Sequence, residues 1–219
     1  MNKQVRIVYE GGQGEIVEKK SRFICNVFVV NSEEEALECI EKMKKKYWDA
    51  RHNCFAYVIG ERQQIQRCSD DGEPSGTAGK PMLDVLLGNK LCNAAVVVTR
   101  YFGGTLLGTG GLVRAYQKST LAGLENSVVF DKCFGKQVSI LTDYNGIGKL
   151  QYIVATMELH TLDTEYTDKV IMKLLVPNEQ LNELEEKVTE ATSGQAKIEV
   201  IEELCYGIHN GEVILLENQ

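Results

Sequence analysis

A glycine-rich segment at residues 103–111 is the part of the chain whose composition points most directly to chemistry. It reads GGTLLGTGG and runs into a predicted helix at residues 112–126. Glycines accept positive φ angles and let backbone amides converge on an anion, and a helix N-terminus adds unpaired amides and a positive dipole end. Arg100 and Arg114 lie on either side of the segment. The pattern predicts a site for a phosphate, either of a nucleotide or of an RNA backbone.

The spacing of these glycines matches neither the P-loop nor the dinucleotide-binding pattern, so no named nucleotide motif is present. The alternative is that the glycines only permit a tight turn from a strand into a helix. The candidate anion-binding or nucleic-acid-binding residues are the glycines and their basic neighbours: Lys80, Arg100, Gly103, Gly104, Gly108, Gly110, Gly111 and Arg114.

A second candidate lies in the polar loop at residues 70–81, where Asp70, Asp71 and Glu73 place three carboxylates within four residues. Carboxylates so close together can hold Mg²⁺ through waters, or they can simply face solvent. A third possibility, which we favour, is that Asp70 or Glu73 pairs with an arginine and pins the loop. The available arginines are Arg51, Arg100 and Arg114. We therefore predict no metal site and no cofactor.

His52 is the only histidine in the first half of the chain. It can act as a general base if Asp70 or Asp71 supports it, or it can be a hydrogen-bonded strand residue. Ser75 could complete a hydrolytic triad, but no G-x-S-x-G elbow is present. We predict no catalytic set. The polar residues that organise this loop are predicted to be Arg51, His52, Asp70, Asp71, Glu73 and Ser75.

A basic cluster surrounds two aromatic residues at the end of another predicted helix. Its members follow one another closely: Lys42, Lys44, Lys45, Lys46 and Arg51, with Tyr47 and Trp48 between them. Charge and stacking together are typical of RNA contact. The alternative is a solvated helix end, where cations favour the dipole.

Regular elements must position these residues. In the first half, strands are predicted at residues 23–30, 53–59, 64–69 and 94–99. Helices are predicted at residues 33–47, 82–87 and 112–126, and Ser32 begins the first with a capping box that ends at Glu35. In the second half, strands at residues 137–142, 161–166, 169–176 and 197–204 alternate with two helices in the ferredoxin-like order βαββαβ. Asn210-Gly211 predicts a further hairpin turn.

Composition supports two domains in a reducing compartment. The 219 residues carry a net charge of −7, which divides into +2 for residues 1–132 (18 Lys/Arg, 16 Asp/Glu) and −9 for residues 133–219 (6 and 15). We predict domains at residues 1–132 and 133–219. Seven cysteines without a C-x-x-C pair indicate reduced thiols, and the N-terminus lacks the apolar run of a signal peptide. We expect a cytoplasmic protein without a membrane span.

Three stretches carry a resemblance to a known family. They read RHNCFAY at 51–57, SDDGEPSGTAGKP at 69–81, and VTRYFGGTLLGTGGLVRAY at 98–116. Together they resemble the IMPACT/YigZ family, also called UPF0029. The resemblance implies an α+β fold of two domains. The first would have the left-handed βαβ crossover of elongation factor G domain IV, and the second would be ferredoxin-like, as in that factor's fifth domain.

The resemblance also implies a role, because the eukaryotic relatives regulate translation by interfering with activation of an initiation-factor kinase. The first hypothesis is therefore a regulatory binding protein that contacts RNA, the ribosome or a translation factor through the glycine and arginine residues. The second is an enzyme or ligand-binding protein acting on a phosphorylated small molecule, with His52 or a loop carboxylate as acid or base.

Overall fold

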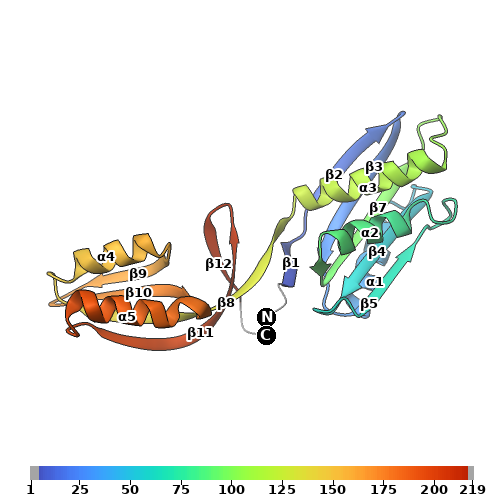
Figure 1. Ribbon diagram of the computed structural model, residues 1–219. Helices are drawn as coiled ribbons and strands as arrows, with labels where there is room; N and C mark the ends of the chain where they lie inside the picture. The colour runs from blue at the N-terminus through green and yellow to red at the C-terminus, as the bar shows by residue number, and fades with distance from the viewer. Residues whose placement is uncertain (1–4, 217–219) are drawn as a thin grey trace. The chain divides into compact units, whose positions relative to one another are not determined.

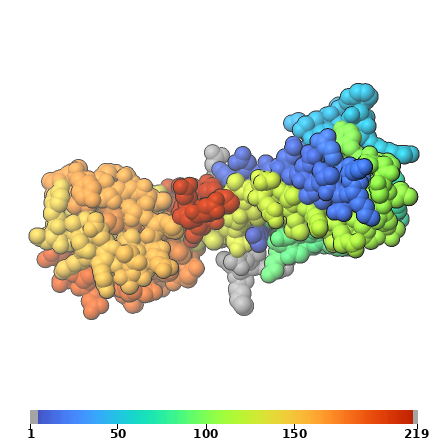
Figure 2. Space-filling view, turned by 90° about the horizontal axis from the view of Figure 1, so that it is seen from above, coloured from blue at the N-terminus to red at the C-terminus, as the bar shows by residue number. Residues whose placement is uncertain are grey.

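The computed structural model describes residues 5–216 and divides into two compact units, Met1–Asp131 and Lys132–Gln219. Both contain a sheet with helices packed on it, so the predicted α+β fold in two parts is confirmed (Figure 1). The space-filling view shows each unit as a continuous body, blue to green for the first and mainly yellow to orange for the second (Figure 2).

The first unit is built on a five-stranded sheet of order β2-β3-β7-β4-β5. Both β3 and β4 pair antiparallel with β7, so they run parallel to each other on its two sides. The chain passes from β3 to β4 through α1, which makes a βαβ crossover over the central strand. The strands are β2 (Gln13–Glu18), β3 (Ser21–Val29), β4 (His52–Ile59), β5 (Ile65–Ser69) and β7 (Ala94–Tyr101).

Helix α1 (Glu33–Lys46) covers one face of this sheet, and its predicted N-terminus is confirmed. The Ser32 Oγ accepts the amide of Glu35 at 3.2 Å, and the Glu35 carboxylate accepts the amide of Asn31 at 2.8 Å. Ala36, Ile40 and Met43 recur at helical spacing and are buried against the sheet in one apolar cluster.

Helices α2 (Gly79–Gly88) and α3 (Thr109–Glu125) pack on the opposite face and enclose the larger core of the unit. Both begin a few residues before their predicted starts, because glycines that are typical of loops open each helix. The close packing of α3 has a visible cause at Gly123, where an added Cβ would lie 2.6 Å from the Cys25 Sγ.

Three short strands were not predicted: β1 (Val5–Glu10), β2, and β6 (Leu91–Cys92), which pairs parallel with β1. Strand β2 forms a hairpin with β3 through a turn at Lys19 and Lys20, whose φ angles are 44° and 67°. Two positive φ angles in a row are usually supplied by Asn-Gly. Two lysines give no such signal in the sequence.

The second unit has the predicted ferredoxin-like order, with all strand pairs antiparallel in the order β9-β10-β8-β11-β12. Helices α4 and α5 cover one face and share a core with β8 and β10. The predicted hairpin forms at Asn210-Gly211, where both φ angles are positive. The elements are β8 (Val128–Thr142), α4 (Ile147–Thr156), β9 (His160–Tyr166), β10 (Val170–Pro177), a 3₁₀ turn (Asn178–Gln180), α5 (Leu181–Thr192), β11 (Lys197–His209) and β12 (Glu212–Leu216).

The boundary between the two units falls inside one strand. Strand β8 begins at Val128 in the first unit and continues without interruption to Thr142 in the second. No helix among residues 5–216 is long and apolar enough to cross a membrane.

Candidate functional site

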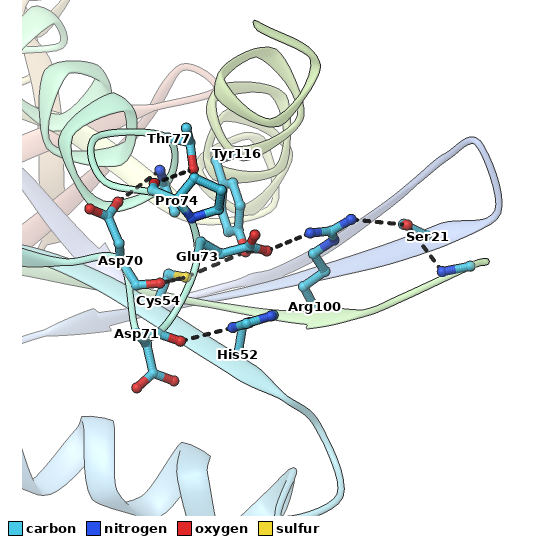
Figure 3. A network of polar contacts seen from close by, with 12 residues as sticks. Ser21, His52, Cys54, Asp70, Asp71, Glu73, Pro74, Thr77, Arg100 and Tyr116 are labelled. Carbon is cyan, nitrogen blue, oxygen red and sulfur yellow. Dashed lines mark hydrogen bonds and ion pairs between the residues drawn. The ribbon is translucent and has the colours of Figure 1, made fainter. Parts of the chain in front are cut away.

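The three motif stretches meet at one end of the five-stranded sheet. Strand β3 begins there at Ser21, β4 begins at His52, and β7 ends at Tyr101. The register places His52 opposite Arg100 and Arg100 opposite Phe23. The polar loop between β5 and α2 lies over this end of the sheet (Figure 3), and the glycine-rich segment between β7 and α3 begins at the same end.

A buried carboxylate lies at the centre of this region. Glu73 Oε1 lies 2.6 Å from Arg100 Nη1 and accepts the Tyr116 hydroxyl at 2.8 Å (Figure 3). The exposed fractions are 8% for Glu73, 6% for Arg100 and 0% for Tyr116. The ion pair therefore joins the loop, the central strand and α3. The predicted pairing of a loop carboxylate with an arginine is confirmed, with Glu73 and Arg100 as the partners.

The remaining contacts of Arg100 hold its guanidinium in the interior. It lies 5.3 Å from the centre of the Phe23 ring and 5.7 Å from that of Phe102, and Nη2 donates to Ser21 Oγ at 3.5 Å. Its Nε has no partner among residues 5–216. Arg100 was expected to present charge to a phosphate. Because its charge is already neutralised and buried, we remove Arg100 from the candidate binding face.

Asp70 organises the loop through backbone amides rather than through an arginine. Its carboxylate accepts the amides of Gly76 at 2.8 Å, Ala78 at 2.9 Å and Gly79 at 2.8 Å. Burial alone would raise the pKa of Asp70, but these three donors hold that pKa below its usual range. Two of the amides open α2, so Asp70 also fixes the start of that helix.

His52 is bonded to a backbone carbonyl and not to a carboxylate. Its Nδ1 lies 2.8 Å from the carbonyl oxygen of Asp71, while the Asp71 carboxylate accepts the amide of Asn53 at 2.6 Å. The Asn53 side chain in turn accepts the Thr99 hydroxyl at 2.7 Å. This geometry matches the interpretation of His52 as a hydrogen-bonded strand residue, since the orienting carboxylate of a general base is not in contact with it.

The cysteine nearest this network is a poor nucleophile. Cys54 Sγ donates to the carbonyl oxygen of Asp70 at 2.9 Å and lies 3.4 Å from the Tyr116 hydroxyl oxygen. Burial raises the pKa of the Cys54 thiol above its ordinary value, and burial also raises the pKa of Tyr116. Both groups therefore stay protonated at neutral pH, and a thiolate is not available.

The glycine-rich segment is exposed. Gly104 and Gly108 have φ angles of 83° and 73°, which explains their residue type. Gly103 approaches the β2–β3 turn so closely that an added Cβ would lie 2.0 Å from the carbonyl carbon of Lys20. Helix α3 begins at Thr109, and its N-cap residue, Gly108, has no side chain that could cap the first turn. We call residues 103–111 together with Arg114 the glycine face.

The other predicted site residues lie apart from the buried network. Arg114 is exposed one turn into α3, and Lys80 is exposed and pairs with Asp84 at 2.7 Å. Arg51 and Ser75 are also exposed, and neither contacts the Glu73 carboxylate. Within residues 5–216, no group of three or more His, Cys, Asp or Glu side chains is arranged to hold a metal ion.

Several residues of the network were not predicted as site residues, among them Ser21, Asn53 and Tyr116. A weak signal existed for Tyr116, which follows Leu112 by four residues and so shares its helix face. That spacing predicts burial of the ring. It does not predict that the hydroxyl reaches a carboxylate.

The fold and this site define an α+β protein of two units, in which a polar loop and an exposed glycine face lie at one end of the sheet of the first unit. Residues 19–124 match the family described as the Impact N-terminal domain, and residues 140–195 match a domain of unknown function, DUF1949. The chain belongs to the IMPACT family.

Two bacterial relatives support this membership over most of the chain. The IMPACT family member YvyE of Bacillus subtilis is 44% identical over 191 residues, which cover 87% of this chain and 88% of that protein. The IMPACT family member YigZ of Escherichia coli is 33% identical over 187 residues, covering 84% and 92%. A crystal structure described as a hypothetical protein is 30% identical, has a TM-score of 0.57, and matches 92% of this chain and 99% of its own.

Proposed function

We propose that this protein regulates translation in the cytoplasm by binding RNA, the ribosome or a translation factor through the glycine face of its first unit. Family membership supports the link to translation, since the resemblance in the three motifs implies that role. The single structural observation behind the choice of surface is the exposed, uncapped N-terminus of the 17-residue helix α3.

The chemistry of the glycine face suits a phosphate group. The first amides of a helix have no partner within it, and here Thr109, Gly110 and Gly111 occupy those positions without bulky side chains. The positive end of the helix dipole lies at the same place, and Arg114 adds a full charge one turn along. The buried Glu73–Arg100 ion pair would then act as a support that holds the β7 end of the segment in place.

An enzyme acting on a phosphorylated small molecule has less support. The sequence hypothesis assigns the role of acid or base to His52 or to a carboxylate of the polar loop. The His52 ring lies within hydrogen-bond distance of a backbone carbonyl oxygen, and Glu73 forms an ion pair with Arg100. The Asp70 carboxylate accepts hydrogen bonds from three backbone amides. Each group is engaged in holding the structure together, so the arrangement favours binding over proton transfer.

Co-sedimentation with ribosomes and with separated subunits across a salt series tests the proposal. We expect saturable binding that weakens as salt rises, because contacts between cations and phosphates release counterions. Arg114→Glu should weaken binding by about tenfold, since it reverses the one full charge of the glycine face. Arg62→Glu is the matched control, because Arg62 is exposed at the turn between β4 and β5, at the other end of those strands.

Equal binding by the Arg114→Glu protein and the wild type would exclude the glycine face. Absence of any binding at low salt would count against the whole proposal. A thermal-shift screen with nucleotides and phosphate would then test the small-molecule alternative.

A further inference from the structure

Trp48, the only tryptophan of the chain, is left outside both cores of the first unit. It lies two residues beyond the end of α1, and 83% of its surface is exposed. An indole ring offers a large apolar area, and 44 other hydrophobic residues are buried among residues 5–216. The exposed ring leaves this apolar area available to a partner.

The backbone that carries Trp48 is well fixed. The amide of Tyr47 donates to the carbonyl oxygen of Met43 at 2.9 Å, and the amide of Ala50 donates to that of Tyr47 at 3.0 Å. The hydroxyl of Tyr101 donates to Asp49 Oδ1 at 2.8 Å, which ties the turn to the end of β7. Little backbone entropy remains to be lost when a partner meets the ring.

Cations without an ion-pair partner lie on the last turns of α1, just before the ring. Lys42, Lys45 and Lys46 are exposed and recur at helical spacings of three and four residues, so they share one face of α1. Lys44 pairs with Glu41 at 3.1 Å, but none of these three lysines has an ion-pair partner within residues 5–216. The ammonium of Lys46 lies 5.0 Å from the centre of the Tyr47 ring.

This surface lies at the same end of the sheet as the glycine face. Tyr101, which holds the turn, is separated from Gly103 by one residue. The guanidinium of Arg22 lies 5.8 Å from the centre of the Tyr101 ring, at the start of β3. Because α1 and α3 cover opposite faces of the sheet, a strand of nucleic acid would have to pass round this end of the sheet to contact both surfaces.

We propose that Trp48 stacks on a base of single-stranded RNA while Lys42, Lys45 and Lys46 bind the flanking phosphates. We call these four residues the tryptophan surface. The inference rests on the proposed function and names the partner class. Charge favours this partner, because three exposed lysines without ion-pair partners within residues 5–216 lie beside an aromatic ring, and this combination suits a polyanion that carries flat bases. Stacking of this kind tolerates any base, so little sequence preference is expected.

Because the chain has a single tryptophan, its fluorescence reports directly on the environment of Trp48. In a fluorescence titration of the full chain, an unstructured oligouridine should quench Trp48 in a saturable way, and added salt should reverse the quenching. Inorganic polyphosphate carries charge but no bases. Polyphosphate should therefore compete with the RNA for the lysines but should quench little of the Trp48 fluorescence.

Variants separate the tryptophan surface from the rest of the molecule. By anisotropy of a labelled oligouridine, Trp48→Ala should bind about tenfold more weakly. Trp48→Phe should retain most of the affinity, because it keeps a ring. Tyr152→Ala is the matched control, since Tyr152 is 73% exposed on α4 in the second unit.

The outcomes distinguish this inference from the proposed function. Oligouridine that binds with unchanged Trp48 fluorescence, and equally well to Trp48→Ala, would overturn the tryptophan surface and leave the glycine face intact. Quenching of Trp48 combined with normal binding by Arg114→Glu would support the tryptophan surface and exclude the glycine face. Ribosome binding that needs Trp48 without any response of its fluorescence to oligouridine would reject single-stranded RNA as the partner of the tryptophan surface. Absence of both RNA and ribosome binding would reject both proposals.

Discussion

The Glu73–Arg100 ion pair is the residue-scale feature on which the site depends. Two opposite charges lie 2.6 Å apart in the interior, and the Tyr116 hydroxyl takes up a further lone pair of the carboxylate. A buried pair of this kind adds little net stability compared with an apolar pair, but removal of one partner leaves an uncompensated charge. Its role is to fix which loop conformation closes over the sheet.

Replacement of one member of the Glu73–Arg100 pair should therefore lower the free energy of unfolding more than replacement of both members. We expect Arg100→Met to lower the free energy of unfolding by about 3–5 kcal/mol. The double variant Arg100→Met with Glu73→Gln should recover a large part of this loss, because no net charge is then buried and the amide oxygen introduced by Glu73→Gln can still accept from Tyr116. Urea denaturation of the wild type, both single variants and the double variant measures the coupling. Additive losses in the double variant would contradict the assignment of a coupled pair.

Sequence reasoning reached part of this network and missed the rest for a physical reason. A carboxylate in the polar loop and an arginine outside it were predicted to pair, since both types lie in the motifs. The hydrogen bonds from backbone amides to the Asp70 carboxylate could not be predicted. They depend on the loop conformation, which includes positive φ angles at Asp71, Gly72 and Gly76. The burial of Arg100 was missed because burial depends on how the loop folds back over the sheet.

At the scale of elements, the start of α3 decides what the glycine face can bind. The sequence predicted a helix from residue 112, but the structure begins it at Thr109. The difference arises because Gly110 and Gly111 are poor helix formers, and their weak propensity is overridden when the helix packs on the sheet. The exposed amides of the first turn thus belong to glycines that the sequence assigned to a loop.

One amide of that turn can be deleted without loss of the helix. Proline is well tolerated at the first helical position, so Thr109→Pro should leave stability nearly unchanged while it removes one N–H donor. We expect phosphate-dependent binding to fall by about 1 kcal/mol, roughly fivefold, in the co-sedimentation assay. Thr109→Ala keeps the amide and removes only the hydroxyl, so it should bind as the wild type does. Equal losses in both variants would assign the effect to the hydroxyl.

Local signals decided which elements could be predicted. Helix α1 was predicted with nearly correct bounds because its capping box, apolar spacing and charge distribution all agree. The β2–β3 hairpin was missed because Lys19 and Lys20 adopt positive φ angles, which lysine residues in a sequence do not indicate. Tertiary packing of β2 against α3 and β3 supplies the stability that the local sequence does not.

At the scale of the whole molecule, charge and binding surfaces are unevenly distributed. Residues 1–132 carry a net charge of +2 and residues 133–219 a net charge of −9. The glycine face and the tryptophan surface both lie in the first unit. The acidic second unit is expected to repel phosphates, which would confine nucleic acid to the first unit.

The order of the elements in the second unit could be predicted from the sequence. Each of its strands, helices and turns is indicated by residues that lie close together in the chain.

The continuity of β8 has a consequence for degradation of the protein. Proteins with two domains are commonly cut first in the exposed segment between them, because a protease needs an unpaired stretch of chain. Here the boundary, between Asp131 and Lys132, lies within strand β8, which pairs with β10 and β11 on both sides from Gly135 onward. Limited digestion with trypsin should therefore spare Lys136 and begin at exposed turns such as Arg62. Early accumulation of a fragment ending at Lys136 would contradict this. The first cuts are thus expected at exposed turns within a unit and not at the boundary between the two units.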